Sequence, residues 1–94
     1  MKEYVIVRST DGDILLKEVK GKNVSYFDRG FVYKNDDGYY CLIDRRTGLA
    51  ICASKKLKDL EYEYIRRRSK YLQLIEGATY VNLVNKFEEL KMKL

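Results

Sequence analysis

The chain has 94 residues, of which 46% are hydrophobic and 35% charged, and it carries a net charge of +5. These values are typical of one globular domain spanning residues 1–94, and they exclude a largely disordered chain. Histidine is absent, which excludes serine–histidine and cysteine–histidine nucleophile systems and nearly all common zinc sites. The chain has no apolar run of about 18 residues and does not begin like a signal peptide, so we expect a cytoplasmic protein without a membrane partner.

Residues 1–53 have the pattern of a sheet built from consecutive hairpins. Runs rich in β-branched and aromatic residues predict strands at 3–8, 14–20, 24–27, 31–34, 39–44 and 49–52. Clusters of Gly, Asp, Asn and Ser predict the turns between them, including those at 28–30 and 45–48. We therefore expect an antiparallel sheet of about five strands within residues 3–53.

The predicted hairpin at 39–52 places both cysteines of the chain on its facing strands. If Arg45 faces Gly48, Cys41 lies opposite Cys52, whereas a bulge at Gly48 makes them diagonal neighbours. We expect the two thiols to be close in either register. Buried free thiols are the expected state in a reducing cytoplasm, and a disulfide or redox pair is the alternative.

From Ser54 onwards the apolar spacing changes to that of a helix. Ser54 is the expected N-cap, Gly77 the expected stop, and Thr79 the expected N-cap of a further helix. Residues 71–75 also alternate, so this stretch is either helix or strand. Apolar residues share one face of the first predicted helix at Leu57, Leu60, Tyr64, Tyr71 and Ile75.

The last segment carries an apolar stripe with the a/d spacing of two heptads. Its members are Tyr80, Leu83, Phe87, Leu90 and Leu94. We expect a helix that packs on its own sheet through this stripe, and a homodimer through the same stripe is the alternative. The predicted fold is therefore α+β, with one or two helices from residues 54–94 packed on the sheet of residues 1–53. The expected core comprises Val5, Val7, Leu15, Leu42, Ile43, Ile51, Leu57, Leu60, Tyr64, Leu83 and Phe87.

Motifs for catalysis or cofactor binding are missing. Neither Gly-x-x-x-x-Gly-Lys-Ser/Thr nor Gly-x-Gly-x-x-Gly occurs, so we expect no nucleotide cofactor. The acidic clusters at 11–13 and 36–38 have the composition of turns and lack the remaining ligands of a calcium loop, so we expect no metal site. These absences argue against an enzyme and favour a binding protein.

The positive charge is concentrated in one segment. Residues 54–70 hold seven Lys/Arg and three Asp/Glu, a net of +4, and such a local excess is either a solvated helix face or a surface for an anionic partner. That partner is either DNA or RNA, through its phosphates, or an acidic protein surface. Asp59 and Glu63 lie among the basic residues and favour the protein. The expected binding residues are Lys55, Lys56, Tyr62, Arg66, Arg67 and Lys70.

Residues 38–51, GYYCLIDRRTGLAI, followed by a lysine-rich helix start, resemble small proteins encoded by bacteriophages and mobile elements. The matching residues are Tyr39, Tyr40, Asp44, Thr47, Gly48, Leu49, Ala50 and Ile51. Some proteins of this kind are similar in size and class to anti-CRISPR proteins, which inhibit a host nuclease by binding it. The resemblance implies a non-catalytic inhibitor or regulator that binds a host protein or ribonucleoprotein complex in a bacterial cell.

Overall fold

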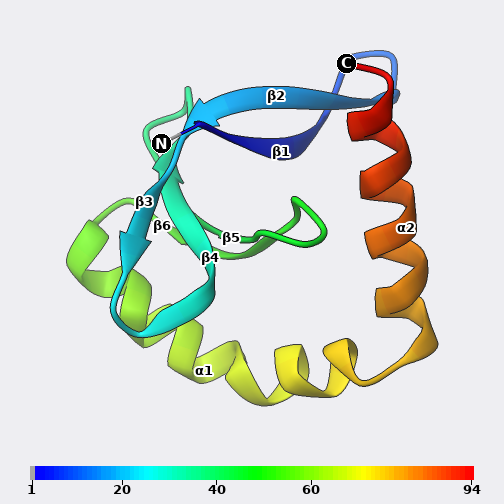
Figure 1. Cartoon of the computed structure of the whole chain (residues 1–94). Coiled ribbons are helices and arrows are strands. Elements are labelled where there is room, and N and C mark those ends of the chain that lie inside the picture. Colours follow the sequence, from blue (N-terminus) through cyan, green and yellow to red (C-terminus); the bar gives the residue numbers. More distant parts are fainter. Residues whose placement is uncertain (1) are drawn as a thin grey trace.

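The computed structural model describes residues 2–94, and over this range the fold is α+β, with the strands first and the helices last. Figure 1 shows the β1–β2 hairpin above a second sheet, α1 below that sheet, and α2 running up from the end of α1 towards the hairpin. The elements are β1 (Lys2–Arg8), β2 (Ile14–Lys20), β3 (Lys22–Val24), β4 (Phe27–Lys34), β5 (Tyr40–Asp44), β6 (Ala50–Ser54), α1 (Leu57–Ile75) and α2 (Ala78–Met92).

The strands form two antiparallel sheets rather than the single sheet of about five strands predicted from the sequence. β1 pairs only with β2, and β3, β4, β5 and β6 follow one another in a second sheet. The chain passes from one sheet to the other at Gly21, the only residue between β2 and β3. A side chain at Gly21 would come within 2.7 Å of Glu3 and 2.8 Å of Phe31, so the close packing at this bend depends on glycine.

The predicted turn at 28–30 is wrong, because β4 runs unbroken through it. The chain reverses instead at Ser25 and Tyr26, inside the predicted strand 24–27. Gly30 is needed for a close approach of two strands rather than for a turn: a Cβ there would lie 1.7 Å from the carbonyl oxygen of Ile43 on β5.

The β5–β6 hairpin contains a bulge that moves the two cysteines to opposite faces of the sheet. Leu42 pairs with Cys52, Cys41 pairs with Ala53, and the register shifts between Leu42 and Ile43. Because a one-residue shift reverses the face of every following side chain, Cys41 and Cys52 belong to different core clusters. The predicted facing pair is therefore wrong and the diagonal alternative is confirmed, although the bulge lies between Leu42 and Ile43 rather than at Gly48. Both cysteines are free.

The four-stranded sheet has a hydrophobic cluster on each face. One cluster packs the sheet against α1 and is built around Phe27, Leu42 and Leu60, and the other packs it against β1 around Val5 and Phe31. Of the predicted core, Leu15 and Leu57 are exposed, while Val7, Ile51 and Leu83 are half-buried. The other predicted core residues are buried, namely Val5, Leu42, Ile43, Leu60, Tyr64 and Phe87.

The helix boundaries differ from the predicted caps by one or two residues. Lys56 rather than Ser54 occupies the N-cap of α1, and the Ser54 hydroxyl accepts a hydrogen bond from the Lys56 amide at 3.3 Å. Gly77, not Thr79, is the N-cap of α2. Residues 71–75 are helical and end α1.

The predicted apolar stripe of α2 faces the rest of the chain. Tyr80 and Phe87 are buried, Leu83 and Leu90 are half-buried, and Leu94 is exposed beyond the helix end. The Phe87 ring lies so close to the turn before β6 that a Cβ at Gly48 would be 2.4 Å from it. The stripe therefore attaches α2 to its own domain, and two of its five side chains are already buried there.

Candidate functional site

Helix α1 is anchored to the sheet by aromatic packing. Tyr64 and Tyr71 project from one side of the helix, and their ring centroids lie 5.1 and 5.6 Å from that of Phe27 on β4. Leu60 completes this buried side. Since 3.6 residues make one turn, the remaining sides of the helix are held in fixed directions relative to the sheet.

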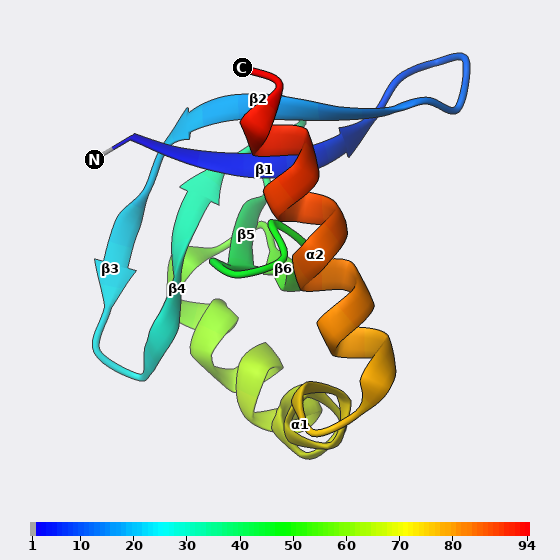
Figure 2. The ribbon, with the colours of Figure 1, turned by 45° about the vertical axis from the view of Figure 1, so that its right-hand side comes forward.

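The outer side of α1 carries an exposed apolar stripe that the sequence analysis did not identify. Tyr62, Ile65 and Leu72 are 63%, 51% and 45% exposed, and their spacing of three and seven residues places them on one side of the helix. Figure 2 shows that none of the other elements drawn for residues 2–94 lies against the outer side of α1. We call this set, Tyr62, Ile65 and Leu72, the outer stripe.

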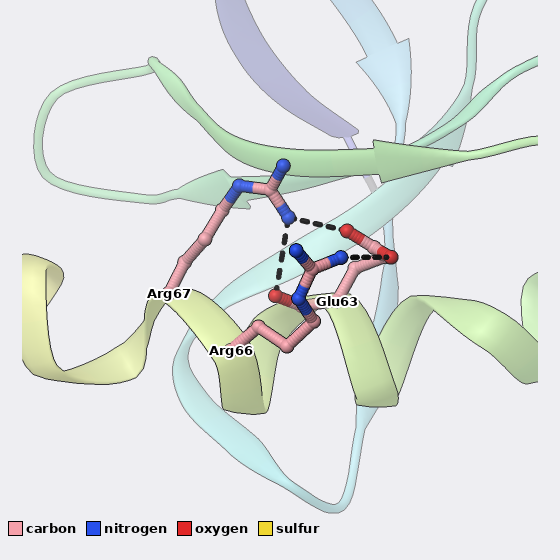
Figure 3. Close-up of polar contacts among 3 residues, drawn as sticks. All are labelled: Glu63, Arg66 and Arg67. Carbon is pink, nitrogen blue, oxygen red and sulfur yellow. Dashed lines mark hydrogen bonds and ion pairs between the residues drawn. The ribbon is translucent and has the colours of Figure 1, made fainter.

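The two predicted arginines share a single carboxylate. Figure 3 shows the guanidinium groups of Arg66 and Arg67 both contacting the carboxylate of Glu63, with the Arg66 ion pair at 3.3 Å. The hydrogen bond from Arg67, together with both positive charges, lowers the pKa of Glu63. The Arg66 guanidinium also lies 6.0 Å from the ring centroid of Tyr62. Arg66 is therefore continuous with the outer stripe, and its charge is partly balanced.

Arg67 and Lys70 do not lie on the outer side of α1 but line a cavity. This cavity, of about 330 Å³, lies between the β5–β6 turn, α1 and α2, and Leu74 and Leu83 contribute to its apolar walls. Lys55 precedes the helix and lies over the ring of Tyr39 at 5.5 Å. The predicted binding residues therefore do not form one patch: Tyr62 and Arg66 lie on the outer side of α1, Arg67 and Lys70 line the cavity, and Lys55 and Lys56 come before the helix.

A buried carboxylate forms the polar floor of the cavity. Asp44 is only 2% exposed and accepts hydrogen bonds from the hydroxyls of Thr47, Tyr71 and Tyr80 at 2.8, 2.6 and 2.8 Å. Burial, followed by the hydrogen bond to Asp44, raises the pKa of both tyrosines. These four side chains come from the β5–β6 hairpin, α1 and α2, so the network fixes the two helices against the turn.

This network was missed because its members are far apart in the sequence. Asp44 and Thr47 have the composition of an ordinary turn, and Tyr71 and Tyr80 were assigned to apolar faces. The three hydroxyl donors occupy the Asp44 oxygens, so the carboxylate has a structural role within this arrangement.

Over residues 2–94, no three Cys, Asp or Glu side chains are grouped closely enough to bind a metal ion. Neither α1 nor α2 is long and apolar enough to cross a bilayer. Comparisons with protein-family models, with curated protein sequences and with solved structures found no match to this chain.

Proposed function

We propose that this chain is a small non-catalytic binding protein that docks on a partner protein through the outer stripe of α1 and Arg66. The observation that supports this most is the exposure of three large apolar side chains along one side of a helix that is firmly packed on its other side. A hydrophobic groove on a partner protein binds an amphipathic helix through apolar side chains that are three, four or seven residues apart. Tyr and Arg at the centre of such a surface are the commonest energetic anchors of protein interfaces.

The balance of charge on α1 favours a protein over bare nucleic acid as the occupant of this surface. Glu63 forms ion pairs with Arg66 and Arg67, and its negative charge would repel a nucleic-acid backbone. Asp59 and Glu61 add further negative charge to the helix. A protein surface of mixed charge can pair with both signs. The apolar side chains of the stripe also have no role in binding phosphates, whereas they would bury apolar area against a protein.

The partner that we propose is a nucleic-acid-handling complex of a bacterial host cell, with the chain acting as a phage- or mobile-element-encoded inhibitor or regulator of the anti-CRISPR type. The resemblance of residues 38–51 and the small size of the chain support this. Inhibition by occupation of a surface needs no catalytic group, only an interface that is already rigid before binding. The packing of α1 on the sheet through Phe27 and Tyr64 supplies that rigidity.

Affinity capture from bacterial host lysate, with and without nuclease, tests this proposal. In one variant the outer stripe is replaced by alanine, which preserves helix propensity. The matched control is Val81→Ala, a residue of α2 that is 55% exposed. We expect the same host protein to be captured by the wild type and by the control after nuclease treatment, and not by the stripe variant. Capture that persists in the stripe variant, or that disappears with nuclease, contradicts the proposal.

A further inference from the structure

A second concave surface lies on the sheet, away from the outer stripe. It is a groove of about 340 Å³ beside the β3–β4 hairpin and the start of α1, which lie next to each other in Figures 1 and 2. Its volume is at the lower end of the range for small-ligand sites. Five side chains give it its chemistry, namely Lys20, Lys22, Lys34, Tyr26 and Tyr40, while Tyr33 lines it from β4 with its side chain on the opposite face of the sheet.

The three lysines give the groove positive charge that no ion pair within residues 2–94 balances. All three are exposed, none of them takes part in an ion pair among residues 2–94, and no Asp or Glu lines the groove. Arg66 and Arg67 of α1, in contrast, are paired with Glu63. The local positive potential is therefore stronger in the groove than its share of the sequence charge suggests.

Tyr26 and Tyr40 pack against the core and are half-buried, so part of each side chain stays accessible. The Tyr26 ring lies 6.1 Å from that of Tyr64, and Tyr40 packs on the cluster around Leu42, whereas Tyr33 packs on the cluster around Phe31 on the other face of the sheet. The ammonium group of Lys34 lies 5.4 Å from the Tyr40 ring centroid. Burial raises the pKa of Tyr26, which favours its neutral form. Rings held in this way can stack on a planar group without losing much conformational freedom.

We propose that this groove binds single-stranded nucleic acid, with the lysines pairing with phosphates and a tyrosine ring stacking on an unpaired base. A combination of basic groups that follow the backbone and aromatic rings that stack on bases is characteristic of sequence-tolerant single-strand binding. A duplex keeps its bases stacked inside and cannot offer one to a recessed ring. Leu57 lines the groove at the start of α1, and Lys55 and Lys56 precede it directly in the sequence.

This site is separate from the outer stripe and does not depend on the function proposed for α1. It also competes with a simpler explanation, because β3 is an edge strand and lysines on edge strands prevent pairing with other chains. The two explanations predict different effects of the same substitutions. Loss of edge protection changes aggregation, whereas loss of a binding site changes the affinity for an oligonucleotide and its salt dependence.

The test is fluorescence anisotropy with a short labelled oligouridylate, measured over a series of salt concentrations. The groove variant is Lys22→Gln with Lys34→Gln, and the control is Arg66→Gln with Arg67→Gln, which removes the same charge from α1. We expect the groove variant to weaken binding by about tenfold or more and to reduce the salt slope by about 1.4, since each phosphate contact on a single strand contributes about 0.7. The control and the outer-stripe variant should bind like the wild type.

A second variant, Tyr40→Leu, keeps an apolar side chain but removes the ring. We expect it to weaken binding by about fivefold or more, which corresponds to the loss of at least about 1 kcal/mol of base stacking. Several results overturn the proposal: no binding at low salt, equal losses in the groove and α1 double variants, tighter binding of a duplex, or equal competition by polyglutamate. Aggregation of the lysine variant with unchanged oligouridylate affinity also overturns it and assigns the lysines to edge protection.

Discussion

At the scale of single residues, the fold depends most on Asp44. Its carboxylate is buried at the end of β5 and accepts three hydroxyl hydrogen bonds, from the turn that follows it and from both helices. A buried charged acceptor of this kind is stable only when its hydrogen bonds are complete. Each donor should therefore contribute more to stability than a surface hydrogen bond would.

We expect Tyr71→Phe to lower the free energy of unfolding by about 1.5–3 kcal/mol, the usual range for a hydrogen bond to a charged group. Tyr64→Phe is the matched control, because Tyr64 is buried on the same helix and its hydroxyl has no hydrogen-bond partner within residues 2–94. Its loss should cost less than about 0.5 kcal/mol. Urea denaturation of both variants gives the comparison, and equal losses would show that the Asp44 hydrogen bond is not the source of the stability.

The same tyrosine should give the stability an alkaline limit. Burial, followed by the hydrogen bond to Asp44, raises the pKa of Tyr71, so the native state keeps a proton that the unfolded chain loses near its normal pKa of about 10. This contribution is complete below about pH 10 and is lost as the pH rises further. In denaturation series above about pH 10, the unfolding free energy of the wild type should fall more steeply than that of Tyr71→Phe. Parallel curves would contradict this.

At the scale of elements, the β5–β6 hairpin shows what the sequence could and could not predict. Its two strands follow from the alternation of aromatic and β-branched residues, and its turn from Thr47 and Gly48. Its register could not be predicted, because the bulge between Leu42 and Ile43 depends on how the turn packs against Ile6, Tyr71 and Tyr80. Local patterns do not contain these distant contacts.

The register predicts that the two thiols are unreactive and do not pair. Burial raises the pKa of Cys41 and raises that of Cys52 to about 11, so few thiolates exist at neutral pH. Alkylation should be slow in the native protein and fast in urea, and mild oxidation should leave the monomer without an internal disulfide. Mass spectrometry of the native protein would contradict this register if it showed a Cys41–Cys52 disulfide, which lowers the mass by the two hydrogens lost.

The contact between the hairpin turn and α2 gives a further prediction. Gly48 has φ +69°, and a Cβ there would meet the Phe87 ring at 2.4 Å. Gly12, with φ +86° and open space around it, is the matched control for backbone strain alone. Gly12→Ala should cost about 1–2 kcal/mol, and Gly48→Ala about 1–3 kcal/mol more because of overpacking.

Hydrogen exchange separates these two effects of the glycine substitutions. In Gly48→Ala we expect faster exchange of the α2 amides, since Phe87 is displaced from its seat on the turn. In Gly12→Ala the α2 amides should exchange at the wild-type rate. Equal stability losses with no change in α2 would show that α2 does not depend on the Phe87–Gly48 contact.

At the scale of the whole molecule, the sequence predicted which segment carries the excess positive charge, but not which surfaces its residues form. The excess of basic residues at 54–70 and the helical period were both readable, and α1 indeed covers most of that segment. The periodicity predicted the inward side of α1 correctly at Leu60, Tyr64 and Tyr71. The division of the basic residues depends instead on the β5–β6 turn and α2, which form a cavity with Arg67 and Lys70 and whose position the periodicity of one helix does not give. The spacing of Tyr62, Ile65, Ser69 and Leu72 was itself a signal, but the inward face offered a competing pattern of the same period.

The groove could not have been found from the sequence. Its lysines and tyrosines belong to β2, the β3–β4 hairpin and β5, and each is unremarkable within its own strand. Only the pairing of these strands and their position beside Leu57 bring them together. The protein thus presents an exposed apolar stripe on α1 and a separate basic groove on its sheet.

Site-specific photo-crosslinking in bacterial host cells tests the central claim most directly. A photoreactive phenylalanine analogue is placed at Ile65 on the outer stripe or, as the control, at Val81, which is similarly exposed on α2. We predict that the probe at position 65 crosslinks to one host protein and that the probe at position 81 does not. Crosslinking from position 65 only to nucleic acid or only to a second copy of this chain would contradict the claim that the outer stripe docks on a host protein.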